Sequence, residues 1–467
     1  MLQTIRQLKK CIMKYQYIPM ERYGLHYIYD CLNSCLYPCS ETDYKNIKSL
    51  DKEELYEYIN VKSIEPNSKN LLIDSLKKGE KHLSKKMYSY QELCRAEIIY
   101  SLANVKQITL EITDECNLKC LYCCYGSLYK KTRKGNTIHQ DPKILLERVL
   151  TLRKKYKIKS SLRISFYGGE PLLEFEKIQE CVTLAHKILP NVTLIFSMTT
   201  NGILLNKYID YLIENDFKLH ISIDGNYRNN EYRITKYHKQ SYPIVYKNIK
   251  KIFQNEPEYF KSNVSFSTVL HDKNNYLDAI EFFSRWGKIP SFSLLSMSNT
   301  RGSTIKNIIN RQKHIDKESI SLIRKLYPII YNELFHDRGN MIYGWEDNTG
   351  IQSMTLKEID MSEKWYYPMK SCFLFSTKIF ISIEGNIHIC EKSSRKYIFG
   401  KITPNRLFIF TKKINQYYNQ INIVFNTICK KCYMRFSCTK CFFSDSEEIL
   451  NGNCICNKNN AEYLIKL

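Results

Sequence analysis

The sequence lacks any apolar run close to the ~18–20 residues that a helix needs to cross a bilayer. Its start, MLQTIRQLKKCIMKYQ, is charged and amphipathic and lacks the apolar core of a secretory signal. No internal repeat or low-complexity linker is evident. These absences argue against a membrane-spanning, secreted or repeat protein. We therefore expect a cytoplasmic protein with no membrane partner.

The composition indicates a multidomain globular chain. Hydrophobic residues make up 43% and aromatic residues 13% of the sequence, which is far from the balance of disordered proteins. A chain of 467 residues is too long for one ordinary core, and length alone suggests about two to four domains.

A formal net charge of +23 raises nucleic acid as a partner. The excess is spread along the chain, because residues 1–100 hold 16 Lys and Arg against 13 Asp and Glu and form no basic arm. Cysteine thiolates bound to a metal carry negative charge that the formal count omits, so they would make the net charge of the protein less positive. We do not expect nucleic acid as the partner, whereas an acidic peptide is compatible with the charge.

Eighteen cysteines are the most informative part of the composition. In a reducing cytosol disulfides are disfavoured, so a Cys-rich chain is expected to bind metal or to carry out redox chemistry. The cysteines fall near the start of the chain, between positions 116 and 124, and in a group of eight between positions 372 and 456, with Cys181 apart from the rest.

Alternating apolar runs and helical patterns predict an α/β fold from about Val105 onward. Asp141 and Pro142 form a helix N-cap and first-turn pair. Six βα units are expected, in a partial (β/α)6 TIM-like barrel that stays open. The predicted domains are a small α+β domain at 1–100, with a hairpin near GLHYIYDCLNSCLYP and helices at 41–58 and 71–86, the barrel at 101–345, and a Cys-rich domain at 346–467. The predicted strands are VKQITLEIT, LRISFY, VTLIFSM, KLHISI, NVSFSTV and SFSLLSM.

Cys116, Cys120 and Cys123 follow the first predicted strand on one short loop. Three thiolates can hold three irons of a 4Fe-4S cubane and leave the fourth iron open to a small molecule. The alternative is a zinc site, but structural zinc usually takes four ligands in two pairs.

These residues, CNLKCLYC, resemble the CxxxCxxC motif of the radical S-adenosylmethionine (radical SAM) superfamily, in which an aromatic residue precedes the last cysteine. The resemblance continues at three further strand ends, FYGGEP, MTTNG and ISIDG, and chemistry in parallel βα barrels sits at such ends. It implies one 4Fe-4S cluster that binds and reductively cleaves S-adenosylmethionine. The cofactor-binding residues that it implies are Tyr122, Gly168, Gly169, Glu170, Thr200, Asn201, Ser222 and Asp224. After ISIDG this chain reads NYRNNEYR, where relatives often have Pro and His-Asp, so Arg233 stands at an unusual offset.

The C-terminal cysteines resemble the SPASM extension of peptide-modifying radical SAM enzymes, which carries two auxiliary 4Fe-4S clusters. By this resemblance Cys429, Cys432, Cys438 and either Cys454 or Cys456 hold one cluster. Cys372, Cys390 and Cys441 hold the other, whose fourth ligand is not evident. The alternative is a zinc ribbon, because paired CxxC motifs are its usual arrangement.

The whole chain resembles the peptide-maturase branch of these enzymes, which implies a ribosomally made precursor peptide as substrate and a thioether or carbon cross-link as product. Residues 1–100 would bind the precursor's leader or simply pack on the barrel. Glu391, beside Cys390, would act as a base or lie on a solvated surface. A reducing electron donor is required.

Two alternatives differ from this reading. One is a sulfatase-activating or other SPASM radical oxidase, and the other is a zinc-ribbon nucleic-acid-binding protein. The sequence does not identify the peptide, the bond formed, the electron donor or the oligomeric state.

Overall fold

The computed structural model describes residues 17–22, 25–30, 35–39, 41–42, 45, 86–87, 89–123, 139–294, 325–326, 365–366, 374–431 and 441–450. None of the helices in these ranges combines the length and apolar character that crossing a bilayer requires.

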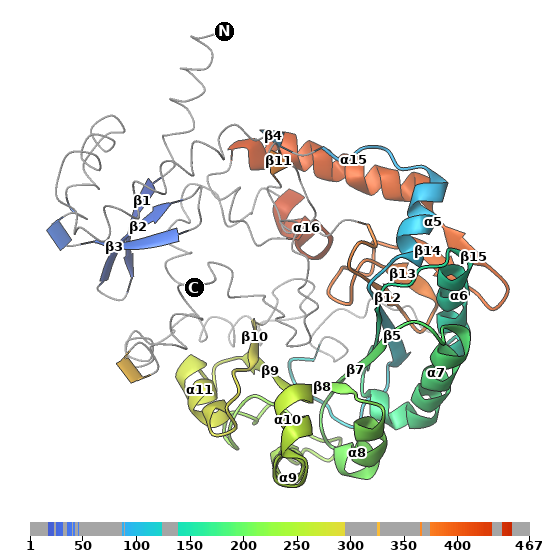
Figure 1. Ribbon diagram of the computed structural model, residues 1–467. Helices are drawn as coiled ribbons and strands as arrows, with labels where there is room; N and C mark the ends of the chain where they lie inside the picture. Colours follow the sequence, from blue (N-terminus) through green and yellow to red (C-terminus); the bar gives the residue numbers. More distant parts are fainter. Residues whose placement is uncertain are drawn as a thin grey trace.

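Six parallel strands form the larger part of a ten-stranded sheet (Figure 1). All six strands expected from the sequence are present, and their spatial order follows the chain from β5 to β10. Side chains alternate along them: on β7, Phe196 and Met198 are buried against the helices, whereas Ser197 and Thr199 face the other side and are half-buried. The fold is thus a mixed α/β fold with a parallel sheet. The strands are β5 (Gln107–Thr113), β6 (Leu162–Gly168), β7 (Leu194–Thr200), β8 (Lys218–Ser222), β9 (Val264–Leu270) and β10 (Ser291–Leu294).

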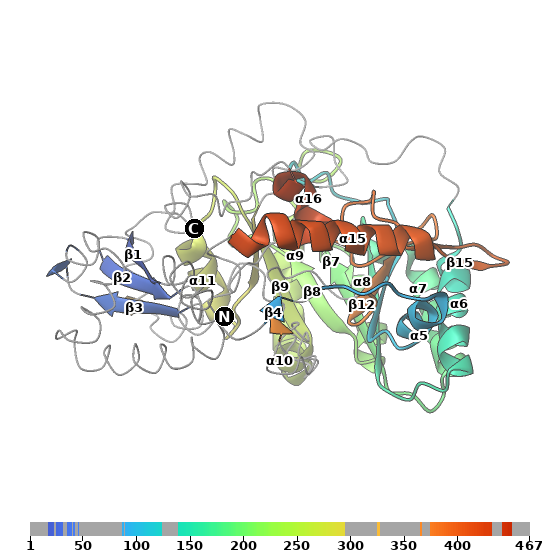
Figure 2. The same cartoon turned by 90° about the horizontal axis from the view of Figure 1, so that it is seen from above.

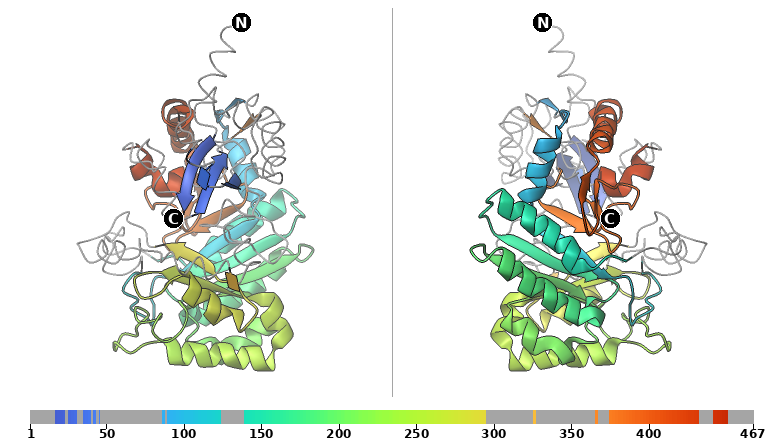
Figure 3. Two further views of the ribbon diagram at one scale, coloured as in Figure 1. Left: turned by 90° about the vertical axis from the view of Figure 1, so that its left-hand side faces the viewer. Right: turned by 90° about the vertical axis from the view of Figure 1, so that its right-hand side faces the viewer.

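Helices cover the outer face of this curved sheet (Figure 1). The first of them, α6, begins as the sequence predicts, because the Asp141 side chain accepts a hydrogen bond from the Lys143 N–H and Pro142 occupies the first turn. In Figure 3 (right) the teal α6 and green α7 lie side by side over the strands. The helices are α6 (Pro142–Lys155), α7 (Phe175–Ile188, preceded by the short η1, Pro171–Glu174), α8 (Leu205–Glu214), α9 (Tyr242–Asn255), α10 (Pro257–Asn263) and α11 (Tyr276–Ser284).

The sheet continues beyond β5 into the region that the sequence assigns to the Cys-rich domain. Strand β12 (Lys378–Ile381) pairs parallel to β5, with Lys378 opposite Gln107. A hairpin then leads to three antiparallel strands. At its turn Gly385 has φ +82°, and a Cβ there would stand 2.2 Å from the Ile402 carbonyl oxygen. The three strands are β13 (Asn386–His388), β14 (Gly400–Ile402) and β15 (Leu407–Ile409).

Helices that precede and follow the barrel segment in the sequence complete the hydrophobic core. Helix α5 (Arg95–Ala103) precedes β5, whereas α15 (Thr411–Thr427) and α16 (Phe442–Leu450) come last in the described chain. Seen from above, α15 runs across the molecule (Figure 2). Its Asn415 and Asn422 side chains bind the backbone at Leu93 and Tyr90. Segments more than 300 residues apart therefore share one hydrophobic core.

Near the start of the chain, β1 (Tyr17–Arg22), β2 (Leu25–Asp30) and β3 (Cys35–Cys39) form an antiparallel sheet. The expected hairpin is the pair β2 and β3. A second small pair joins β4 (Lys86–Met87) to β11 (Trp365–Tyr366). The helices expected at 41–58 and 71–86 fall largely outside the described residues, and the N-terminal α+β domain stays a prediction.

Candidate functional site at the carboxyl ends of the strands

The three clustered cysteines lie on the loop that follows β5, which we call the cluster loop (residues 114–123). Their thiols are near one another, since each influences the titration of its neighbours. The Cys116 Sγ accepts hydrogen bonds from the Leu118 N–H at 3.4 Å and from the Asn201 Nδ2 at 3.6 Å. Burial raises the pKa of Cys120 to about 12. Burial also raises the pKa of Cys116, so loading a metal or cluster on these two thiols releases protons.

The paired glycines after β6 allow the backbone to approach the cluster loop closely. Gly169 donates its N–H to the Thr113 carbonyl and Glu170 donates to the Glu115 carbonyl, both at 2.9 Å. A Cβ on Gly168 would stand 2.1 Å from the Thr113 carbonyl oxygen at the end of β5, and a Cβ on Gly169 would stand 2.1 Å from the Glu115 carbonyl oxygen of that loop. The partner in this close approach is the backbone just before Cys116.

Glu170 joins this segment to the end of β7. Its carboxylate is fully buried and accepts hydrogen bonds from the Thr200 hydroxyl at 2.9 Å and from the Asn201 N–H at 2.7 Å. Burial raises the pKa of Glu170 to about 7 in spite of these donors. Asn201 in turn reaches the Cys116 Sγ and the Asn117 side chain. Three of the four sequence motifs thereby contact one another, as the strand-end argument predicts.

Asp224 follows β8 and is also fully buried. Arg233 binds it through two nitrogens, at 2.9 and 3.0 Å, and the Tyr122 hydroxyl donates to its Oδ2. Burial opposes ionisation, but the Arg233 charge dominates and lowers the pKa of Asp224 to about 2. Ser222, at the end of β8, is half-buried.

The sequence reading missed His271, which follows β9. Its ring stacks on Tyr122 with the ring centres 5.8 Å apart, and its Nε2 lies 3.7 Å from the Asp224 Oδ2. The side chain is completely buried. His271 stands at the carboxyl end of a predicted strand, where functional residues of parallel βα barrels lie. The sequence therefore contained the signal for this residue.

Cys390, Glu391 and Cys441 lie together at the other end of the sheet. Cys390 and Cys441 influence each other electrostatically, and the Ser394 N–H donates to the Phe443 carbonyl at 2.8 Å. Burial raises the pKa of Cys390 to about 12. These are two of the three cysteines expected in one auxiliary site.

The Glu391 side chain is only 7% exposed, so it does not lie on a solvated surface. Its Oε1 is 2.8 Å from the Lys378 Nζ. Burial by itself would raise the pKa of this carboxyl, but Lys378 outweighs burial and lowers it. Glu391 is therefore a carboxylate, the protonation state that a base needs.

The remaining predicted metal ligands are only partly visible. Cys429 is buried in the short helix η2 (Cys429–Lys431). The other five lie outside the described residues: Cys372, Cys432, Cys438, Cys454 and Cys456.

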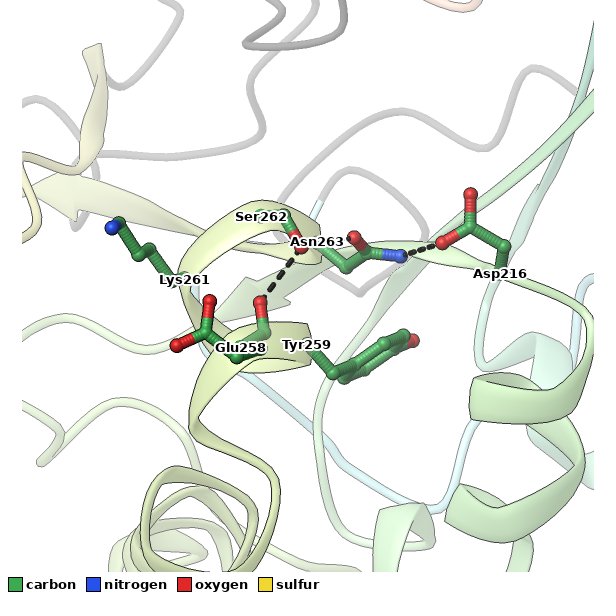
Figure 4. Close-up of a pocket in the computed structure, with 6 residues that line it drawn as sticks. All are labelled: Asp216, Glu258, Tyr259, Lys261, Ser262 and Asn263. Carbon is green, nitrogen blue, oxygen red and sulfur yellow. Dashed lines mark hydrogen bonds between the residues drawn. The ribbon is translucent and has the colours of Figure 1, made fainter.

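One hollow on the surface, shown in Figure 4, lies away from these groups at the amino ends of β8 and β9. Asp216 accepts a hydrogen bond from the Asn263 Nδ2 at 2.6 Å, and Ser262 donates to the Glu258 carbonyl. Tyr259 donates its hydroxyl to the Phe217 carbonyl at 2.6 Å. These polar groups satisfy one another, and we place the candidate site at the cluster loop instead.

The comparisons with known proteins bear on this site directly. Residues 110–285, from β5 to the end of α11, match the model of the radical SAM superfamily. This chain carries a radical SAM superfamily domain. It is a radical SAM enzyme, and the non-catalytic zinc-ribbon alternative is set aside.

Several relatives share parts of this radical SAM chain. An uncharacterised protein of Methanocaldococcus jannaschii is 29% identical over 239 residues, which cover 49% of this chain and 75% of that protein. The radical SAM cyclopropyl synthase TigE of Paramaledivibacter caminithermalis is 22% identical over 66% of this chain and 62% of that protein. The GTP 3′,8-cyclase of Clostridium perfringens is 32% identical over 26% of this chain and 35% of that protein. Among solved structures, native anSMEcpe with bound AdoMet aligns with TM-score 0.47 and 17% identity over 74% of this chain and 98% of that chain.

The cluster loop fits the 4Fe-4S cluster that the radical SAM superfamily implies. Within the described residues, no three His, Cys, Asp or Glu side chains are grouped to hold a single metal ion. A cubane has a different requirement, because each thiolate binds a separate iron. Cys116 also accepts two N–H···S hydrogen bonds, an arrangement that stabilises a thiolate ligand. When bound, the cluster would supply the electron that cleaves S-adenosylmethionine.

Proposed function

We propose that this radical SAM enzyme is a peptide maturase that forms a thioether or carbon cross-link in a ribosomally made precursor. The observation that carries the proposal is the grouping of Cys390, Cys441 and the buried carboxylate Glu391. Two thiols beside a base suit an auxiliary cluster that accepts an electron while the base accepts a proton.

The position of this group supports the proposal. Lys378, which binds Glu391, pairs with Gln107 at the amino end of β5, whereas the cluster loop follows Thr113 at the carboxyl end. At ~3.3 Å per residue the two ends are about 20 Å apart. An extended peptide segment of several residues spans such a distance.

The face of the sheet between the amino end of β5, near Glu391, and its carboxyl end, near the cluster loop, is polar. Gln107 donates to the Ser165 hydroxyl at 3.0 Å, and Ser165 and Ser197 share a hydrogen bond of 2.5 Å. His220 follows on the same face of β8 and bonds to Ser265. Hydroxyl, amide and imidazole groups suit the amides of a peptide better than an apolar substrate. The alignment with a radical SAM cyclopropyl synthase over 66% of this chain agrees with an enzyme that forms a new carbon–carbon bond.

The test is to co-express the full chain with each short open reading frame encoded beside its gene and to measure the peptide masses. A cross-link removes two hydrogen atoms. Thiol alkylation separates the two products, because a thioether consumes a free thiol and a carbon link does not.

The matched control is the triple variant Cys116→Ala, Cys120→Ala, Cys123→Ala, which should leave the peptide unmodified. Protease digestion distinguishes the sulfatase-activating alternative, since oxidation of a single serine or cysteine leaves the fragments unlinked. Unmodified peptides from an enzyme that cleaves S-adenosylmethionine would argue against a maturase.

A further inference from the structure

The segment that follows Asp224 holds the cluster loop through its backbone. We call residues 226–235 the strap. The Lys119 N–H donates to the Ile234 carbonyl at 2.7 Å, and the Leu121 N–H donates to the Tyr232 carbonyl at 3.0 Å. Leu118 also pairs with Thr235 as an antiparallel bridge. The strap is the part of the sequence that departs from the superfamily pattern.

The strap has its own internal order. Asn230 accepts the Asp224 N–H at 3.0 Å and donates to the carbonyls of Gly225 and Asn226, both at 2.7 Å. Its side chain is 1% exposed. This buried amide fixes the turn, and the turn brings Arg233 back onto Asp224.

The Asp224 carboxylate is saturated by groups of the protein itself. Its Oδ1 accepts from Arg233 at 3.0 Å and from the Val269 N–H at 2.9 Å, and its Oδ2 accepts from Arg233 at 2.9 Å and from the Tyr122 hydroxyl. A carboxylate offers about four lone-pair sites. Since the side chain is also 0% exposed, no site is left for a ligand.

Tyr122 links this pair to the cysteines. It stands between Cys120 and Cys123 in the chain, and the Arg233 guanidinium lies 5.4 Å from its ring centre. The ring is 8% exposed and also stacks on His271. The hydroxyl of Tyr122 and the backbone of the strap therefore fix the cluster loop from two directions.

We propose that Asp224, Arg233 and Tyr122 form a positioning triad that holds Cys120 and Cys123 in place and balances the charge beside the cluster. In this arrangement Asp224 and Arg233 act through Tyr122 and do not contact S-adenosylmethionine. The proposal rests on the radical SAM domain and is independent of the peptide substrate.

The charge balance gives the proposal a distinctive signature. Asp224 and Arg233 together are neutral, so removing Asp224 alone leaves an unbalanced buried charge. Asp224→Asn leaves a cation, which favours the reduced cluster and shifts its potential upward. The double variant Asp224→Asn, Arg233→Met leaves no charge and should return the potential to the wild-type value. A merely structural role would not give a shift in potential that removal of the second charge reverses.

The first experiment titrates the cluster of the reconstituted full chain by electron paramagnetic resonance. The cluster that responds to added S-adenosylmethionine is followed. Arg228→Met, an exposed arginine on the same strap, is the matched control and should keep the wild-type potential. We expect an upward shift in Asp224→Asn that the double variant Asp224→Asn, Arg233→Met reverses, with the affinity for S-adenosylmethionine within about twofold of wild type in both. Unchanged potentials with a tenfold or greater loss of affinity in both variants would show direct cofactor ligands and overturn the proposal.

A second experiment needs no cluster and covers variants that do not retain iron. Hydrogen exchange is measured on the unloaded full chain for the peptide that spans the cluster loop. Tyr122→Phe should exchange about tenfold faster there, as expected for losing one buried hydrogen bond, and Arg233→Met, which loses two, should exchange at least tenfold faster. Arg228→Met should not change the exchange. Wild-type exchange in the first two variants would overturn the positioning role.

Discussion

Replacing Gly169 by alanine should separate the two backbones that meet at the candidate site. The added Cβ would stand 2.1 Å from the Glu115 carbonyl oxygen and 2.6 Å from its carbonyl carbon. Both atoms belong to the backbone, so no flexible side chain can move aside. The segments must part by about 1 Å to restore an ordinary contact, and this weakens the two 2.9 Å hydrogen bonds from Gly169 and Glu170.

The magnitude follows from these contacts. Overpacking costs about 1–3 kcal/mol, and each weakened hydrogen bond costs up to about 1 kcal/mol. We expect Gly169→Ala to lower the free energy of unfolding by about 1–5 kcal/mol. A displacement of about 1 Å beside the reacting centre also costs on the order of 100-fold in rate. Urea unfolding of the unloaded chain and the rate of 5′-deoxyadenosine formation measure the two effects.

Gly287→Ala is the matched control, because nothing lies within 4 Å of a Cβ at Gly287 and only its φ of +62° opposes the change. It should cost about 1 kcal/mol and leave the rate unchanged. If Gly169→Ala kept the wild-type rate and lost no more stability than Gly287→Ala, the close approach of the two segments would not matter for catalysis.

Three further predictions concern other buried groups. Arg153→Met should lower the free energy of unfolding by at least about 3 kcal/mol, since it leaves the buried carbonyls of Ala103 and Val105 without their donor. The control, Lys154→Met at an exposed position, should change that free energy by less than about 0.5 kcal/mol. Urea titration measures both. Burial, with a smaller contribution from Lys392, lowers the pKa of His220 to about 4. In the unfolded chain His220 therefore binds a proton below pH ~6.5, whereas in the folded chain it binds one only below pH ~4. The free energy of unfolding accordingly falls by about 3 kcal/mol as the pH drops from ~6.5 to ~4. His220→Gln should remove that part of the pH dependence, and equal slopes in both proteins would contradict it. Glu391→Gln should still cleave S-adenosylmethionine but form at least tenfold less peptide product. Glu281→Gln, on the exposed face of α11, should retain both the cleavage and the product. Product at the wild-type level from Glu391→Gln would exclude Glu391 as the base.

The sequence predicted the parallel part of the fold well, because each strand from β5 to β9 is a clear apolar run followed by a helical pattern. The extension of the sheet was not predicted. Strands β12 to β15 have only three or four residues each and lie among cysteines and aromatics, so no period is visible. Long-range pairing with β5 through Lys378 and Gln107 stabilises them, and local sequence does not encode such pairing.

At the candidate site, sequence predicted which strand ends carry polar groups but not how those groups bind one another. Glu170 contacts Thr200 and Asn201, and this follows from neighbouring strand ends. Asp224 was expected to serve the cofactor, and its saturation by Arg233 and Tyr122 depends on the path of the strap. That path follows from the buried amide of Asn230, whose role has no signature in sequence.

The most direct test of the account is to measure iron, acid-labile sulfide and 5′-deoxyadenosine formation after anaerobic reconstitution. The wild-type chain is compared with the triple variant Cys116→Ala, Cys120→Ala, Cys123→Ala. With four irons per cubane, we expect about twelve irons to fall to about eight and the cleavage of S-adenosylmethionine to be abolished. About four irons falling to none would retain the radical SAM cluster and reject the auxiliary ones. A variant that keeps its iron and its cleavage activity would contradict the assignment of these three cysteines.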